Sequence, residues 1–179
     1  PSKSRGLGDV YKRQVCYWMV GYGFMFGASK SGFVGLDNFL FDPSGAAASG
    51  PAMTFFIFQS MFCATAASII SGAVAERLKF NSYLIITALV GTILYPVIGH
   101  WSWANSDDNY GGDLSTGWLY DLGFVDFAGS TVVHSTGGWI GLAIILIIGP
   151  RSGRFVDGET RKFSPSNLPL SVLGVLLLG

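Results

Sequence analysis

Charged residues are scarce in this sequence. Only 12% of its 179 residues are Asp, Glu, Lys or Arg, whereas soluble domains carry about 25%. Eleven basic residues balance eleven acidic ones, so the formal net charge is zero. The basic surface that nucleic-acid binding requires is therefore missing. Half of the residues are hydrophobic, and the mean hydropathy is +0.46. This composition excludes an ordinary soluble domain and predicts a membrane protein.

Cysteine and histidine are limited to two residues each. Cys16 and Cys63 lie in apolar segments and lack the spacing of a metal site or a redox motif. We therefore expect no metal and no other cofactor. The two histidines, His100 and His134, also fall in apolar stretches. An ionisable side chain inside a membrane span is costly, so it is a candidate for a functional role.

Three stretches are long and apolar enough to cross a bilayer, which takes about 20 residues. They cover residues 52–75, 83–104 and 126–149. Val15 to Gly27 and Asn167 to Gly179 are interpreted as parts of two further helices. Residues 15–179 are thus expected to be a partial membrane domain, an internal fragment of an all-α polytopic membrane protein. Residues 1–14 are polar and basic, and we interpret them as a loop or as a non-native segment.

The loops between these stretches differ in charge. Basic residues follow the first and third stretches: Arg77, Lys79, Arg151, Arg154, Arg161 and Lys162. The loops that precede residues 52 and 126 hold Lys30 as their one basic residue and carry the acids Asp37, Asp42, Asp107, Asp108, Asp113 and Asp121. Because cytoplasmic loops are enriched in Lys and Arg, the basic loops are predicted to be cytoplasmic and the acidic loops external.

Small residues recur along two of the stretches. Ala64, Ser68 and Gly72 are spaced four residues apart in the first, and Gly137 and Gly141 are spaced likewise in the third. Such spacing puts small side chains on one helix face, where a neighbouring membrane helix can approach closely. Both faces are predicted to be helix contacts.

The third stretch begins with an acid and contains a histidine. Asp126 is expected to cap the helix by accepting hydrogen bonds from the free N–H groups of its first turn; the alternative is direct attraction of a cation. His134 lies eight residues further, roughly 12 Å along a helix that starts at Asp126. It is interpreted as lining a conduction path or handling protons, against the alternative of a packed core residue.

Aromatic residues lie near the external ends of the other two stretches. Phe58 and Phe62 are one turn apart on one helix face. They are either ordinary packing residues or part of a constriction. Gln59 lies between them in the sequence and must face protein, because an amide is unusual in contact with lipid. Trp103 ends the stretch that Pro96 is expected to kink. It is either an interfacial anchor or a cation–π partner for an ammonium-like ion. A bare potassium ion would instead require rings of oxygen ligands, for which the sequence offers no candidate.

Several motifs resemble the ammonium transporter (Amt/Mep/Rh) family. They are FQSMFCATAASIISGAVAERLKF (58–80), the run 96–103 ending in HWSW, DFAGSTVVHSTGGWIGL followed by GPRSGRF (126–155), and YGFMFG (22–27). The resemblance covers nearly everything after Gln14. It implies a fold of eleven membrane helices, of which this chain corresponds to part of helix 2 through part of helix 6. Trp103 favours the Amt branch.

The resemblance also assigns residues to an outer ammonium site. Trp103 resembles the tryptophan of that site, and Phe62 resembles the upper phenylalanine of the pore gate, which also contacts the solute. Asp126 resembles the aspartate that orders the site structurally without touching the solute. The backbone at Ala128 lies where the family brings the main chain close to the recruited ion.

The remaining positions belong to the gate and the pore. Phe58 lies one turn above Phe62 in the gate, and His134 resembles the first of two pore histidines. The family pattern places the second histidine beyond Gly179. By this resemblance, ammonium is recruited outside and loses a proton, and ammonia then passes the histidines.

The expected protein is not an enzyme but a multi-pass transporter in the cell membrane. Its implied partners are ammonium or ammonia, the lipid bilayer and two further copies in a homotrimer, with a cytoplasmic PII-type protein as a candidate regulator. One alternative is an ammonium sensor with an Amt-like membrane domain. Another is an intramembrane hydrolase that uses Asp126, His134 and Ser130, which is disfavoured because nothing supplies an oxyanion site.

Overall fold

The structure of the chain is a computed structural model that describes residues 14–42, 50–105, 116–164 and 167–178. It consists of two units, residues 1–148 and residues 149–179. Residues 1–14 were expected to be a loop or a non-native segment, and residues 1–13 of it lie outside the described residues. The acids Asp107, Asp108 and Asp113 also lie outside them.

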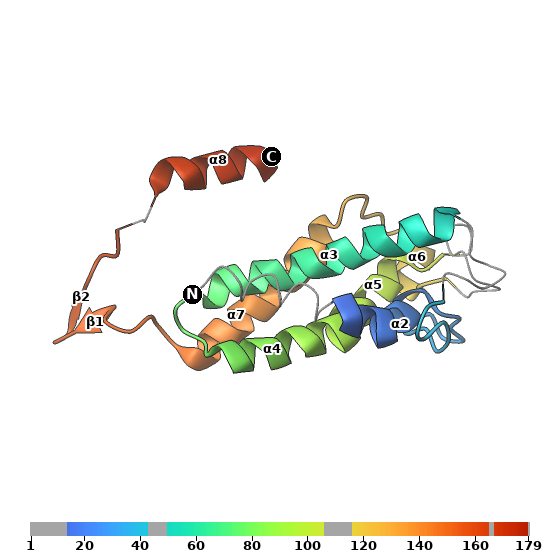
Figure 1. Cartoon of the computed structure of the whole chain (residues 1–179), viewed down its shortest axis with the longest axis horizontal. Helices are drawn as coiled ribbons and strands as arrows, with labels where there is room; N and C mark the ends of the chain where they lie inside the picture. The colour runs from blue at the N-terminus through green and yellow to red at the C-terminus, as the bar shows by residue number, and fades with distance from the viewer. Residues whose placement is uncertain (1–13, 43–49, 106–115, 165–166, 179) are drawn as a thin grey trace. The chain divides into compact units, whose positions relative to one another are not determined.

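The regular secondary structure in the described part of the first unit is all helical (Figure 1). Short π-helical segments, η1 to η3, each run directly into an α-helix. In chain order the elements are η1 (Tyr17–Gly21), α2 (Tyr22–Phe26), α3 (Gly50–Val74), α4 (Phe80–Leu89), η2 (Val90–Leu94), α5 (Tyr95–Trp103), α6 (Trp118–Asp121), η3 (Ser130–Ser135) and α7 (Thr136–Ile148).

Three continuous helices in the described residues are long and apolar enough to cross a membrane. They are Gly50–Val74, Phe80–Trp103 and Ser130–Ile148, of 25, 24 and 19 residues. The three predicted spans are confirmed, although the third begins four residues later than expected. The reason is Gly129, whose φ of 85° is left-handed and cannot continue a right-handed helix from Asp126.

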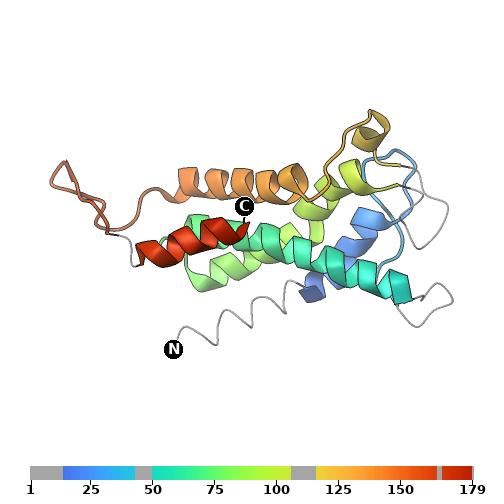
Figure 2. The ribbon, with the colours of Figure 1, turned by 90° about the horizontal axis from the view of Figure 1, so that it is seen from above.

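Helix α7 packs along α3 through glycines, and the two views of the ribbon show the helices side by side (Figures 1 and 2). A Cβ atom at Gly137 would lie 2.8 Å from the carbonyl oxygen of Ala66, and one at Gly141 would lie 3.0 Å from the Cβ of Ala73. Both distances are shorter than van der Waals contact, so only glycine allows the backbones this approach. The predicted contact face of Gly137 and Gly141 is confirmed.

The small-residue face predicted on α3 is not the face that α3 packs within this chain. Ser68 is exposed, and a Cβ at Gly72 would meet no described atom within 4 Å. The buried face is instead made by Cys63, Ala66, Ala67, Ile70 and Val74. Spacing alone identified small residues on α3 but did not identify which side of the helix faces α7 and η3.

The span Phe80–Trp103 passes through η2 just before Pro96. Proline has no N–H to donate to the preceding turn, and a π-helical turn is a common way to absorb such an irregularity. Segment η2 packs against η1, where a Cβ on Gly21 would lie 2.2 Å from the carbonyl oxygen of Gly91. The two irregular segments therefore meet at a point where their backbones are in direct contact.

His100 is fully buried, at 0% exposure. Its Nδ1 lies 2.9 Å from the carbonyl oxygen of Met25. Since a carbonyl can only accept, Nδ1 carries the hydrogen and donates it. This bond ties α5 to α2 and holds the ring inside the first unit.

The second unit contains a two-stranded hairpin and a helix. Strands β1 (Phe155–Val156) and β2 (Glu159–Thr160) pair in antiparallel fashion. The two connecting residues, Asp157 and Gly158, have φ values of 53° and 81°, as a tight hairpin turn requires. The apolar helix expected from Asn167 is confirmed as α8 (Leu168–Leu178), and the side-chain oxygen of Asn167 accepts a hydrogen bond from the N–H of Leu170.

Candidate functional site

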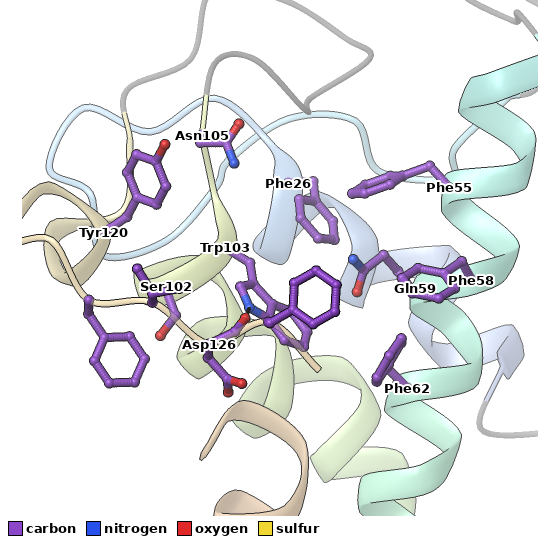
Figure 3. Close-up of a pocket in the computed structure, with 13 residues that line it drawn as sticks. Phe26, Phe55, Phe58, Gln59, Phe62, Ser102, Trp103, Asn105, Tyr120 and Asp126 are labelled. Carbon is purple, nitrogen blue, oxygen red and sulfur yellow. Dashed lines mark hydrogen bonds between the residues drawn. The ribbon is translucent and has the colours of Figure 1, made fainter. Parts of the chain in front are cut away.

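A cavity of about 320 Å³ lies at the end of the first unit where α5 finishes and α3 begins (Figure 3). Most of its wall is aromatic. The aromatic lining residues are Phe26, Phe55, Phe58, Phe62, Trp103, Tyr120, Phe124 and Phe127, and the others are Gln59, Ser102, Asn105, Val125 and Asp126. Four of the residues predicted for the outer site and gate, Phe58, Phe62, Trp103 and Asp126, thus surround one space.

Trp103 is the last residue of α5, and its ring is fixed at the cavity wall. The indole Nε1 donates a 2.6 Å hydrogen bond to the main-chain oxygen of Asp126. The polar edge of the ring is therefore occupied by protein. The ring contributes its π face to the cavity, and an aromatic face attracts cations within about 6 Å of its centre.

Phe62 closes the inner side of the cavity against Trp103. Their ring centroids are 5.8 Å apart, and the planes meet at 74°. Phe58 packs edge-on against Phe62 from one turn above, with centroids 4.7 Å apart. Phe58 itself remains 55% exposed. The three rings therefore pack in sequence, with the exposed Phe58 on Phe62 and Phe62 on Trp103.

The carboxylate of Asp126 is saturated by the start of the third span. Its Oδ1 accepts from the N–H groups of Gly129 and Ser130 at 2.9 and 3.0 Å. Its Oδ2 accepts from Thr131 and Val132 at 2.9 and 2.7 Å. This is the bonding expected of a cap, although the acid acts from four residues before the helix and Gly129, not Asp126, occupies the N-cap position. The acid stands in the cavity wall with its lone pairs already engaged.

His134 belongs to η3 and does not line this cavity. Because the helix begins at Ser130, the residue lies about 6 Å along it and not the predicted 12 Å. Its Nδ1 lies 3.1 Å from the carbonyl oxygen of Gly129, so Nδ1 carries a hydrogen and donates it. The same carbonyl accepts from the N–H groups of Val133 and His134, both at 2.9 Å. This bond holds the ring, and no described residue makes a hydrogen bond to Nε2 of this exposed side chain.

Ala128 is likewise outside the lining of the cavity. It lies in the exposed turn between Asp126 and Gly129. The structure therefore brings together the aromatic residues and the acid of the predicted site, but not Ala128 or His134.

Several lining residues were not anticipated. Phe26 ends α2, and Tyr120 belongs to α6, a short helix in a loop expected to be merely polar. The sequence held a signal for this helix: Trp118 and Tyr120 are large aromatic residues in an otherwise polar loop. Their segment is anchored by backbone bonds from Gly117 to Ala104 and from Trp118 to Gly32.

Metal chemistry has no support in this part of the molecule. Within residues 14–42, 50–105, 116–164 and 167–178, no three His, Cys, Asp or Glu side chains gather as metal ligands would. The chemistry of the cavity is that of aromatic faces, one saturated carboxylate and a few amide and hydroxyl groups.

Comparison with known proteins finds ammonium transporters as relatives of this chain. The family model of the Ammonium Transporter Family matches residues 7–179. A putative ammonium transporter of Synechocystis sp. is 50% identical over 176 residues, which is 97% of this chain and 32% of the relative. The ammonium transporter Amt2 of Archaeoglobus fulgidus is 35% identical over 178 residues, covering 97% of this chain and 37% of that protein.

Solved structures show the same likeness. The structure named Sensor Amt Protein superposes with a TM-score of 0.82 at 42% identity, over 97% of this chain and 42% of the other. Saccharomyces cerevisiae Mep2 superposes with a TM-score of 0.74 at 27% identity, over 96% of this chain and 37% of the other. The chain thus spans about a third of the length of the curated relatives it matches.

Proposed function

Because this chain belongs to the Ammonium Transporter Family and is a multi-pass membrane protein with part of that fold, we propose that the complete protein transports ammonium across the cell membrane. Ammonium is recruited at the aromatic cavity, and ammonia crosses an apolar pore lined by histidine. The complete protein is further proposed to be a homotrimer, with a cytoplasmic PII-type protein as its candidate regulator.

The observation that carries this proposal is the cavity wall around Trp103. The indole N–H and the Asp126 carboxylate are both engaged by the main chain. A solute therefore meets π faces and not a free acid. Such a wall holds a small cation weakly enough for it to leave again, whereas a free buried carboxylate would hold the charge.

The gate and pore roles follow from the positions beneath this wall. Phe62, packed edge-on against Trp103, separates the mouth from the apolar interior. His134 offers an imidazole whose Nδ1 is fixed by Gly129, which leaves Nε2 to interact with a passing solute or proton. Ala128 is proposed to present its backbone to the ion in the complete protein.

Trp103→Leu in the full-length protein tests the recruitment site. Leucine keeps an apolar wall but has no π face, so the ammonium concentration that gives half-maximal flux should rise about 5- to 10-fold, the worth of roughly 1 kcal/mol of cation–π attraction. Flux is measured as the total ammonium and ammonia taken up into proteoliposomes, a quantity that counts the solute whether or not charge crosses with it.

Trp101→Leu is the matched control. Trp101 is two residues away in α5, and its Nε1 bonds to the main-chain oxygen of Phe33 outside the cavity lining. An unchanged concentration dependence in Trp103→Leu, with intact assembly, would remove Trp103 from the recruitment site.

A second candidate function is ammonium sensing. It is favoured by the 42% identity and the TM-score of 0.82 to the structure named Sensor Amt Protein. A sensor would bind ammonium with the same site but pass little of it. Binding without sustained flux in the full-length protein would support sensing and contradict transport.

A further inference from the structure

Gln59 is a buried polar residue in the aromatic wall of the cavity. It lies on α3 between Phe58 and Phe62 and is only 6% exposed. Its amide end points away from α3, toward Trp103 and Phe26 (Figure 3). An amide buried at a membrane helix is costly unless it serves a partner, and so its position requires a reason.

The side-chain oxygen of Gln59 has no hydrogen-bond partner among the described residues. This distinguishes it from Asp126 and Trp103, whose polar groups are engaged by the main chain. Both oxygens of the Asp126 carboxylate accept two N–H groups each, and the Trp103 Nε1 hydrogen is donated to main chain. Gln59 Oε1 is therefore a buried acceptor, with lone pairs available, at the edge of a cavity built of aromatic faces.

We propose that Gln59 is a specificity-determining residue of this cavity, and that its side-chain oxygen accepts a hydrogen bond from an N–H of the bound ammonium ion. The proposal rests on the proposed function and adds to it a directional contact. Aromatic faces attract any small cation regardless of its chemistry. A single acceptor oxygen favours a cation that carries N–H donors.

One oxygen also suits ammonium better than a bare alkali ion. Ammonium can give one N–H to Gln59 and direct its remaining N–H groups at the rings. A potassium ion must lose hydration and needs a ring of several oxygens in return, of which Gln59 Oε1 can supply only one. Gln59 would thus supply selectivity where the rings supply attraction.

The test compares Gln59→Met with Gln59→Glu in the full-length protein. Methionine is unbranched and similar in length, so it fills the same volume without an acceptor oxygen. Glutamate is isosteric and keeps the oxygen. Gln59→Met should raise the half-saturating ammonium concentration about 10-fold or more, the worth of one hydrogen bond to a charged group. Gln59→Glu should bind ammonium no more weakly than the wild type.

Ser60→Ala is the matched control. Ser60 is the next residue, is buried, and donates its hydroxyl hydrogen to the main-chain oxygen of Ile57 at 2.7 Å. It does not line the cavity, so its loss should leave the half-saturating concentration unchanged.

Two results would overturn the proposal. One is wild-type affinity in Gln59→Met. The other is equal weakening in Gln59→Met and Gln59→Glu, since packing and not an acceptor would then be what the site requires. Failure of the proposed function is separate: it would appear as absence of ammonium binding and flux in the wild-type protein itself.

Discussion

Replacing Asp126 with asparagine keeps the shape of the side chain and removes one of its two acceptor oxygens. The remaining oxygen can still accept from Gly129 and Ser130, as Oδ1 does in the structure. The new NH₂ group then faces the N–H groups of Thr131 and Val132, which Oδ2 now serves. Two donors lose their acceptor and meet another donor.

The expected cost follows from where these two N–H groups lie. Thr131 is exposed, so water can take over. Val132 is 0% exposed, and an unpaired buried N–H costs about 1–3 kcal/mol. Loss of the negative charge beside the helix start adds about 0.3–1 kcal/mol. We therefore expect Asp126→Asn to lower the local opening free energy of the first turn of η3 by about 1.3–4 kcal/mol.

Amide hydrogen exchange of the full-length protein in detergent measures this opening free energy. The peptide that contains Gly129 to Val133 should exchange about 9- to 900-fold faster in Asp126→Asn, at 1.36 kcal/mol per tenfold change. Asp121→Asn is the control, because Asp121 is exposed and accepts from the Thr116 hydroxyl and not from the helix start. An acceleration below about 5-fold would refute the assignment of the carboxylate as the main support of this turn.

Two further substitutions test the third span. His134→Ala should reduce ammonium conduction at least about 10-fold in the full-length protein, with little change in thermal stability, because the exposed ring makes one side-chain bond, to Gly129; wild-type flux and selectivity would contradict a pore role. Gly137→Val should destabilise the protein by about 1–3 kcal/mol in reversible unfolding, since its Cβ would lie 2.8 Å from the Ala66 oxygen. Gly138→Val, where a Cβ meets no described atom within 4 Å, should cost much less; equal costs would show that helix propensity and not the α3–α7 contact is responsible.

Sequence patterns predicted the features that depend on local chemistry. Length and hydropathy located the three spans, and the rarity of an amide in lipid predicted that Gln59 faces protein, which its 6% exposure confirms. The hydrogen bonds of Asp126 could also be anticipated, because an acid just before Gly129, Ser130 and Thr131 can reach their free N–H groups. Each of these conclusions needs only a few neighbouring residues.

Other features depend on contacts between distant segments, and these were missed. The π-helical segments have no sequence period of their own, and η1 and η2 meet where Gly21 touches Gly91. His100 is buried because Met25, 75 residues earlier, offers it a carbonyl. The Asp157–Gly158 hairpin is a different case, since that dipeptide is a recognised local turn signal and could have been found in the sequence.

The turn from Asp126 to Gly129 has a structural consequence. The Trp103 indole is bonded to the main-chain oxygen of Asp126, the Asp126 carboxylate to the N–H of Gly129, and the carbonyl of Gly129 to the imidazole of His134. These three hydrogen bonds form one series through the four residues from Asp126 to Gly129. The same short turn therefore sets the orientation of both the indole at the cavity and the imidazole of the third span.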